Sequence, residues 1–256
     1  MSPAINSENV SVVLCRPRYP ENIGAAARAM RNMGFDQLVV VDPQNCDLTR
    51  ILKMATHAAS DVVEQMQVHA DLQAALAPFN YVVGTTARLG GQRQSVVPAH
   101  KLAPELAAIT ENNRVGLVFG PEDRGLTNED LRLCHRLVNI PTAEFSSLNL
   151  AQAVMIICYE LRRHRSAQGK PFVPRLANRH ELDGMYAQLK DVLVKISYIQ
   201  PDNPDYFMNN IRQFGTRLKL RAKEVSIVRG ICRQINWYGK KCFQEGRKHK
   251  GDDQCD

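Results

Sequence analysis

Three polar segments of this sequence carry side chains that could bind a ligand and do chemistry on it. Asn22–Arg28 holds an amide and a guanidinium, Gly120–Leu126 places a carboxylate between two glycines, and Ser146–Ala151 combines hydroxyls with an amide. Such groups orient polar substrates through hydrogen bonds, and a guanidinium also stabilises negative charge. Because the second and third segments lie close together in the sequence, we expect them to share one pocket.

A parallel sheet would bring these segments together. Short apolar runs predict buried strands at Val10–Leu14, Leu38–Val41, Tyr81–Gly84, Val115–Phe119 and Leu137–Ile140. Helical patterns lie between or after them, near Asn22–Met33, Thr49–Val63, Asp71–Ala77, Pro104–Ile109, Asn128–Cys134 and from a serine cap to Arg163. Continuous apolar strands that alternate with helices are typical of an α/β fold whose parallel sheet is covered on both faces. In such a sheet ligands bind at the carboxyl ends of the strands, where the polar segments lie.

Each candidate residue also has a purely structural interpretation. Asn22 could cap the first helix, and Arg28 could be a solvated surface residue. Glu122 could accept hydrogen bonds from backbone N–H groups of its own loop. The serines before Asn149 could cap a buried helix, with Asn149 in its first turn, and Thr127–Asp130 is typical of a capping box.

The first helix also carries an almost bare face. Gly24 lies inside it and is followed by three alanines. Glycine within a helix costs roughly 0.8–1 kcal/mol relative to alanine, so a close contact must offset that cost. Another backbone segment or a partner subunit could make the contact.

Motif content excludes several classes of function. The seven cysteines contain no Cys-x-x-Cys pair, which indicates neither a zinc site nor a disulfide framework and favours a reducing cytoplasm. Dinucleotide, phosphate-loop and His-Glu-x-x-His motifs are missing, and the histidines are isolated. No apolar run is long enough to span a membrane, and the first residues do not resemble a signal peptide. We therefore expect no metal and no membrane partner.

Charge divides the chain into two parts. Residues 1–160 hold 13 Lys+Arg and 16 Asp+Glu, a balance of −3, whereas residues 161–256 hold 20 and 10, a balance of +10. This favours chemistry in the first part and attraction of a polyanion by the second, although a solvated appendage would have the same charge. Residues 166–180 read as a linker, followed by helices near 180–198, 204–217 and 223–238 and a disordered end at 239–256.

The three polar segments, taken in order, resemble the SpoU branch of the SPOUT RNA 2′-O-ribose methyltransferases. The resemblance covers residues 8–163 and is carried by Asn22-x-Gly-x-x-x-Arg28, by Gly120-x-Glu-x-x-Gly-Leu126 and by Ile140-Pro followed by Ser147-Leu-Asn-Leu-Ala-Gln-Ala153. Within the branch, the residues of the last two segments are similar to those of tRNA ribose methyltransferases. The basic helical extension that follows them is similar too.

The resemblance implies a fold, a cofactor and an assembly. It implies a SPOUT catalytic domain at 1–165 with a trefoil knot at its C-terminal end, a linker at 166–180, and a helical tRNA-binding extension at 181–256. It also implies S-adenosylmethionine as methyl donor, a cytoplasmic homodimer, and a dimer contact near the alanine face at 25–29.

Site residues follow from the same resemblance. Arg28 would lie nearest the 2′-hydroxyl, Asn22 and Asn149 would position the ribose or Arg28, and Glu122 and Ser147 would shape the pocket. The methyl donor is expected at Thr85, Thr86, Ala87, Gly120, Gly125, Leu126, Ile140, Ser146, Ser147 and Leu148. RNA is expected at Arg16, Arg18, Arg88, Arg93, Arg212, Arg217, Lys219, Arg221 and Lys223.

Several functions stay open at this point. The leading hypothesis is methylation of cytidine or uridine at nucleotide 32 in the anticodon loop of tRNA. Another tRNA site, or ribosomal RNA, would need the same chemistry. A knotted RNA-binding module without turnover is a hypothesis of a different class. A generic nucleotide-binding α/β enzyme is disfavoured, because its glycine fingerprint is missing.

Overall fold

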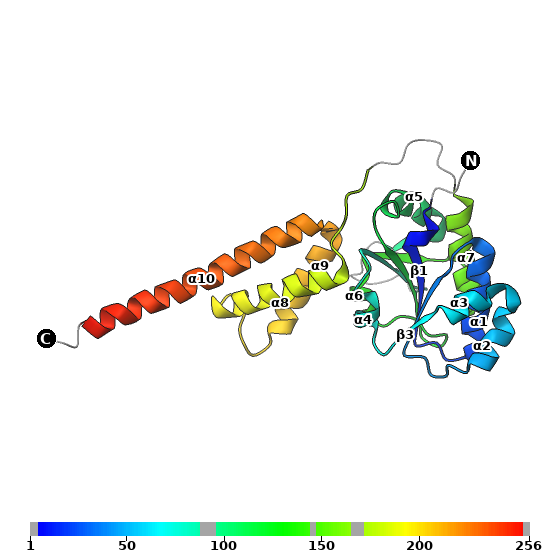
Figure 1. The fold of residues 1–256 in the computed structure, drawn as a ribbon, viewed down its shortest axis with the longest axis horizontal. Helices are drawn as coiled ribbons and strands as arrows, with labels where there is room; N and C mark the ends of the chain where they lie inside the picture. Colours follow the sequence, from blue (N-terminus) through cyan, green and yellow to red (C-terminus); the bar gives the residue numbers. More distant parts are fainter. Residues whose placement is uncertain (1–4, 88–95, 144–146, 165–171, 253–256) are drawn as a thin grey trace. The chain divides into compact units, whose positions relative to one another are not determined.

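Seven strands form one parallel sheet in the first of two structural units (Figure 1). The computed structural model describes residues 5–87, 96–143, 147–164 and 172–252, and the chain divides into unit 1, Met1–Asn178, and unit 2, Arg179–Asp256. The strand order is β3-β2-β1-β6-β4-β7-β5, and each neighbouring pair is parallel. The strands are β1 Val10–Cys15, β2 Gln37–Val41, β3 Gln67–His69, β4 Tyr81–Thr85, β5 Val96–Pro98, β6 Val115–Phe119 and β7 Arg136–Asn139.

Helices cover both faces of this sheet, with α4 and α6 on one side and α1, α2 and α7 on the other (Figure 1). Met30, Leu106 and Val154 belong to one buried cluster, and Leu76 and Leu131 belong to a second. The helices of unit 1 are α1 Pro20–Met33, α2 Leu48–Ala55, α3 Ser60–Glu64, α4 Leu72–Leu76, α5 Ala99–Ile109, α6 Asn128–Arg132 and α7 Leu150–Arg163, with 3-10 turns η1 Ser7–Asn9 and η2 His57–Ala59. The predicted α/β architecture is confirmed.

Unit 2 consists of helices α8 Arg179–Lys195, α9 Pro204–Leu218 and α10 Ala222–Asp252. Val225 and Cys232 of α10 are buried, and α10 is joined to α8 by hydrogen bonds from Arg229 Nε to Gln188 Oε1 (3.1 Å) and from Asn236 Nδ2 to Asp191 Oδ2 (3.3 Å). The predicted end of the last helix near residue 238 is wrong. The backbone stays helical to Asp252, which makes α10 31 residues long.

Several predicted helix boundaries in unit 1 are also wrong, each for a local reason. Pro20 is the first residue of α1, where its missing N–H needs no partner. The single helix predicted at 49–63 is divided, because Thr56 has a φ of 62° in the left-handed region. α5 begins at Ala99 and accommodates Pro104 in its interior. The strands β3 (Gln-Val-His) and β5 (Val-Val-Pro) were not predicted, because each is only three residues long.

Part of the predicted linker belongs to unit 1. Asn80 Nδ2 donates a hydrogen bond of 2.7 Å to the Leu176 carbonyl, and the Leu176 N–H donates one of 2.7 Å to Asn113 Oδ1. Leu176 and Ala177 are buried. The stretch from 172 to 178 therefore packs against the rest of unit 1 and is not a free linker.

The face of α1 that carries Gly24 packs closely against α2 of the same chain. A Cβ on Gly24 would lie 2.1 Å from the Ile51 carbonyl oxygen, so the backbones of α1 and α2 approach each other there. Of the two contacts that the sequence left open for this glycine, the one with another backbone segment is present. Ala25 and Ala29, on a different side of α1, line a surface groove.

Candidate active site

A pocket of about 350 Å³ lies at the carboxyl ends of β4, β6 and β7. The pocket brings together the segments that follow β4, β6 and β7, which the sequence predicted to bind the methyl donor. Its lining residues are Thr85, Thr86, Ala87, Phe119, Gly120, Pro121, Glu122, Asp123, Arg124, Gly125, Leu126, Val138, Asn139, Ile140, Ser147, Leu148, Leu150 and Ala153. This volume is within the range of small-molecule sites. Of the residues predicted to bind the donor, Ser146 lies outside the described residues.

The two glycines of the second segment determine the shape of one pocket wall. A Cβ on Gly120 would lie 2.3 Å from both the Gly125 carbonyl carbon and the Leu126 nitrogen. Gly125 has a φ of 68°, and its N–H donates a hydrogen bond of 2.9 Å to the Pro121 carbonyl. The loop thus folds tightly back on itself, and a side chain at Gly120 would force it open.

Hydrogen bonds also hold the opposite wall, which follows β4. The Thr86 N–H donates to the Val138 carbonyl over 2.9 Å, and Asn139 Nδ2 donates to the Thr86 carbonyl over 3.0 Å. Thr85 Oγ1 donates to the Val118 carbonyl over 3.1 Å. Sequence reasoning missed Asn139, for which the available signal was an amide side chain at the end of an apolar run.

A chain of hydrogen bonds joins the three polar segments beside this pocket. Asn22 Nδ2 donates to Glu122 Oε1 over 2.6 Å, and Asn149 Nδ2 donates to Asn22 Oδ1 over 2.9 Å. The Arg18 N–H donates to the other carboxylate oxygen, Glu122 Oε2, over 3.0 Å. We call Glu122, Asn22 and Asn149 the amide–carboxylate chain. Each contact orients the next, because Glu122 only accepts when ionised and each amide uses both its oxygen and its nitrogen.

Two caps that the sequence left open as structural interpretations are not the ones present. Asn149 itself is the N-cap of α7, since its Oδ1 accepts hydrogen bonds from the N–H groups of Ala151 (2.9 Å) and Gln152 (3.4 Å). Its position is therefore one residue before the helix rather than in the first turn. Asn22 does not cap α1, whose N-cap is Tyr19.

Arg28 lies outside the strand-end pocket, in the adjoining groove between α1 and α7. This groove has a volume of about 460 Å³ and is lined by Ala25, Arg28, Ala29, Asn32, Leu148, Ala151, Gln152, Met155 and Ile156. Leu148 borders both cavities. Arg28 is exposed, and no residue in the described part of the chain forms a hydrogen bond or ion pair with its guanidinium.

The groove also corrects a prediction about α7, which was expected to be buried nearly all round. Leu150, Val154 and Leu161 are buried, but Met155 and Ile156 line the groove and Tyr159 is 49% exposed. One apolar face of this helix is thus uncovered within the chain.

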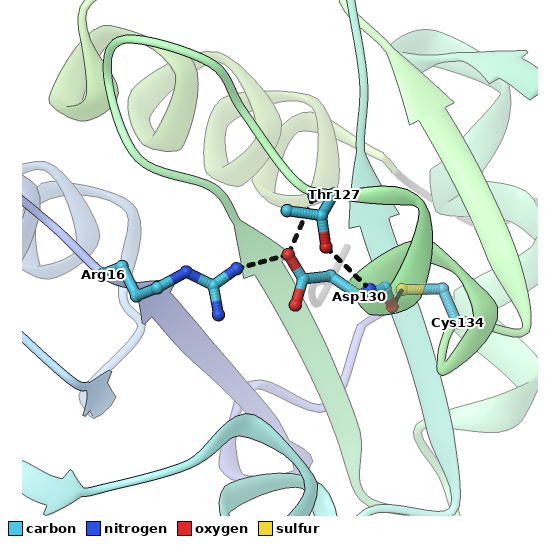
Figure 2. A network of polar contacts seen from close by, with 4 residues as sticks. All are labelled: Arg16, Thr127, Asp130 and Cys134. Atoms are coloured by element: carbon cyan, nitrogen blue, oxygen red, sulfur yellow. Dashed lines mark hydrogen bonds and ion pairs between the residues drawn. The ribbon is translucent and has the colours of Figure 1, made fainter.

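Two of the arginines predicted to bind RNA form ion pairs with acids of unit 1. Figure 2 shows the Arg16 guanidinium against the Asp130 carboxylate, which also accepts a hydrogen bond of 2.8 Å from the Thr127 N–H. Thr127 and Asp130 form the predicted capping box of α6. Arg18 Nη1 lies 3.0 Å from Asp123 Oδ2. Both arginines hold the loop after β1 against the segment that forms the pocket wall.

The remaining residues predicted to contact RNA lie either outside the described residues or in unit 2. Arg88 and Arg93 lie outside the described residues. In unit 2, Arg212 is paired with Asp205 at 3.6 Å, while Arg217, Arg221 and Lys223 are exposed and Lys219 is half-buried.

Cysteine and metal chemistry find no support around the pocket. Burial raises the pKa of Cys15 and that of Cys158 to about 12, so both thiols stay protonated in the core. Within the described ranges, no group of three or more His, Cys, Asp or Glu residues could hold a metal ion. No described helix is both long and apolar enough to cross a membrane.

Comparison with known proteins identifies the family. The SpoU rRNA Methylase family matches residues 9–159, and the C-terminal domain of the tRNA methyltransferase TrmJ matches residues 180–250. The chain belongs to the SpoU methylase family. A TrmJ from Pseudomonas aeruginosa is 37% identical over 243 residues, which cover 88% of this chain and 92% of the relative. A TrmJ from Photorhabdus laumondii is 32% identical and covers 91% and 99%.

A solved structure supports the same assignment over both units of the chain. The crystal structure of TrmJ from Z. mobilis ZM4 has a TM-score of 0.76 and 31% identity, and the match covers 88% of this chain and 98% of that one. As a SpoU methylase, the protein is an RNA 2′-O-methyltransferase that uses S-adenosylmethionine. The strand-end pocket fits such a donor, because glycine-rich backbone and exposed strand-end groups line it.

We expect the Arg16–Asp130 pair to stabilise the pocket wall. Replacing Asp130 with Asn keeps the shape but leaves a partly buried guanidinium unpaired and weakens the cap of α6. The free energy of unfolding should fall by about 1–3 kcal/mol, measured by urea denaturation. Affinity for S-adenosylmethionine, measured by calorimetry, should fall with it.

Asp123→Asn is the matched control for this substitution. It breaks the neighbouring Arg18–Asp123 pair, whose side chains are 38% and 42% exposed. Exposed pairs contribute about 0–1 kcal/mol, so the effect should be small. Equal effects of the two substitutions would contradict a special role for Asp130.

Proposed function

We propose that this protein methylates the 2′-hydroxyl of a ribose in tRNA. The observation that carries the proposal is the amide–carboxylate chain, which links three loops beside a donor-sized pocket next to an unpaired arginine. The relatives from Pseudomonas aeruginosa and Photorhabdus laumondii are both tRNA 2′-O-methyltransferases, which supports tRNA as the substrate. Ribosomal RNA is the alternative that the family description suggests, and the match of unit 2 to a tRNA methyltransferase domain favours tRNA.

The reaction requires alignment and charge stabilisation more than strong acid–base catalysis. S-adenosylmethionine supplies a methyl carbon on a sulfonium, a leaving group that needs no protonation. The protein must hold a ribose hydroxyl in line with that carbon, and such alignment can contribute about 7–11 kcal/mol. The rigid walls around Gly120 and Thr86 and the oriented amides of Asn22 and Asn149 are suited to this task.

Arg28 has the position and the charge to activate the hydroxyl. An arginine stays protonated in proteins, so proton abstraction by Arg28 is chemically unfavourable. Its positive field would instead lower the pKa of the hydroxyl and stabilise the developing alkoxide. The proton would then pass to water or to an RNA phosphate. In this proposal the amide–carboxylate chain orients the nearby ribose, and Leu148 separates donor and hydroxyl sites.

We infer a homodimer from the α1–α7 groove. Its floor of Ala25, Ala29, Met155 and Ile156 is apolar and open, and a second copy would cover it. Pairing there would bury Arg28 beside the partner and exclude water from the hydroxyl. The trefoil knot and the cytoplasmic location implied by the family resemblance remain part of the proposal.

The target nucleotide is predicted to be cytidine or uridine at position 32 of the anticodon loop. Purified protein incubated with unmodified tRNA transcript and S-adenosylmethionine should add one methyl group to the ribose at that position. Mass spectrometry of nuclease fragments locates the group. Methylation of another tRNA nucleotide would correct the position, whereas methylation of ribosomal RNA alone would contradict the substrate.

Replacing Arg28 with Ala should lower kcat by about 100- to 1,000-fold, because a charge that stabilises the developing oxyanion is lost. Calorimetric affinity for S-adenosylmethionine should change little, since Arg28 does not line the strand-end pocket. Arg31→Ala serves as the control. Arg31 lies on the same helix but pairs with Asp36 (2.8 Å) and Asp61 (3.1 Å), and its loss should leave kcat unchanged. Equal activity of Arg28→Ala and the wild type would refute the assignment.

Replacing Ile156 with Arg should prevent dimer formation, because it puts a charge into an apolar contact. Analytical ultracentrifugation should show a monomer, with methylation lost. Leu52→Arg, on the exposed face of α2, should leave the dimer intact. A dimeric Ile156→Arg protein would rule out this groove as the interface.

A further inference from the structure

Trp237 on α10 is the single tryptophan of the chain, and it is 54% exposed. Helical neighbours one turn away surround it with positive charge: Arg233 precedes it by four residues, and Lys240 and Lys241 follow by three and four. All three are exposed, and Lys241 Nζ lies 5.5 Å from the centroid of the indole ring. Lys241 also forms an exposed ion pair of 3.8 Å with Glu245, a type of pair that contributes only about 0–1 kcal/mol and that a phosphate can replace. We call Arg233, Trp237, Lys240 and Lys241 the tryptophan face.

This face is separate from the surface that packs within unit 2. α10 contacts α8 through Val225, Arg229, Cys232 and Asn236, spaced four, three and four residues apart along one side of the helix. Trp237 is turned about 100° from Asn236 around the helix axis. The indole ring is therefore not needed to hold α10 against α8.

Charge around the tryptophan face favours a polyanionic partner. Along α10, from Ala222 to Asp252, the sequence holds 8 Lys+Arg and 3 Asp+Glu, a balance of 8 − 3 = +5. Gly230, two turns before Trp237 on the same side, adds no side chain that would block a flat ligand. A broad aromatic ring among cations is the combination that binds single-stranded nucleic acid, by stacking on a base while the cations contact phosphates.

We propose that Trp237 stacks on an unpaired base of the RNA substrate, with Arg233, Lys240 and Lys241 contacting the adjacent phosphates. This inference rests on the proposed function for its substrate, and it extends the RNA surface beyond the basic residues predicted from the sequence. It assigns to α10 a preference for unpaired rather than duplex RNA, because stacking requires an open base face.

A protein partner is the competing occupant of this helix. Ile227, Ile231 and Tyr238 form an exposed apolar stripe on another side of α10, at four- and seven-residue spacing. A partner helix would bind to that stripe and bury Tyr238 more than Trp237. The two possibilities therefore differ in which aromatic residue binding depends on.

The single tryptophan makes the test direct, because fluorescence excited selectively in the long-wavelength indole band, where the seven tyrosines do not absorb, reports on Trp237 alone. Titration with tRNA transcript or an eight-nucleotide oligouridine should quench the fluorescence, and an RNA duplex of the same length should quench it much less. Trp237→Ala should weaken tRNA binding by about 5- to 150-fold in filter binding, the range for loss of one stacked base. Trp237→Phe should restore most of the affinity.

Tyr238→Ala is the matched control and should bind tRNA like the wild type. Lys240→Gln with Lys241→Gln should reduce the slope of log affinity against log salt by about two, since each phosphate contact contributes about one. Unquenched fluorescence at saturating tRNA, or a loss of binding in Tyr238→Ala but not in Trp237→Ala, would overturn the proposal.

Methylation measurements separate this inference from the proposed function. At saturating tRNA, Trp237→Ala should keep the kcat of the wild type, with the loss confined to KM. A wild-type protein that is quenched by RNA but methylates no tRNA would refute the proposed function and leave the assignment of this face intact. Normal methylation by Trp237→Ala with unchanged KM would refute the face alone.

Discussion

The hydrogen bonds between Glu122, Asn22 and Asn149 are the interaction on which the candidate site depends. They connect residues 100 and 127 positions apart, from the loop after β6, the start of α1 and the start of α7. Asn149 has a second task, because its oxygen caps α7 while its nitrogen bonds to Asn22. A shift of α7 would therefore also shift Asn22 and, through it, the Glu122 carboxylate.

Backbone proximity is the second constraint, and it explains why the site needs glycine. Gly120 is pressed against Gly125, and Gly24 against the Ile51 carbonyl, at distances that leave no room for a Cβ. The first contact gives the pocket wall its curvature. The second brings α1 close to α2, which sets where Asn22 and Arg28 lie relative to the sheet. Each glycine thus positions polar groups that lie elsewhere in the chain.

The sequence predicted the parts of the fold that local patterns encode. The strands β1, β2, β4 and β6 are mostly apolar runs, and β7 has a central Leu-Val pair. Their parallel arrangement places the polar segments at one edge. The chain of hydrogen bonds could not be predicted, because which acid meets which amide depends on packing between distant segments. The ion pair of Arg16 with Asp130 was missed for the same reason. Its position in a polar loop suggested RNA, and nothing in the local sequence indicates Asp130 as its partner.

The ion pairs of Arg16 and Arg18 affect which of the two units attracts RNA. Arg16 and Arg18 each face a carboxylate, which weakens the field they present to an RNA phosphate. Unit 1 carries 18 Lys+Arg and 16 Asp+Glu, and unit 2 carries 15 and 10, so the larger net charge, +5 against +2, belongs to the smaller unit. Attraction of a polyanion would then fall mainly to unit 2. In the proposed function, Arg28, which has no partner among the described residues, would act on a single hydroxyl while unit 2 holds most of the RNA.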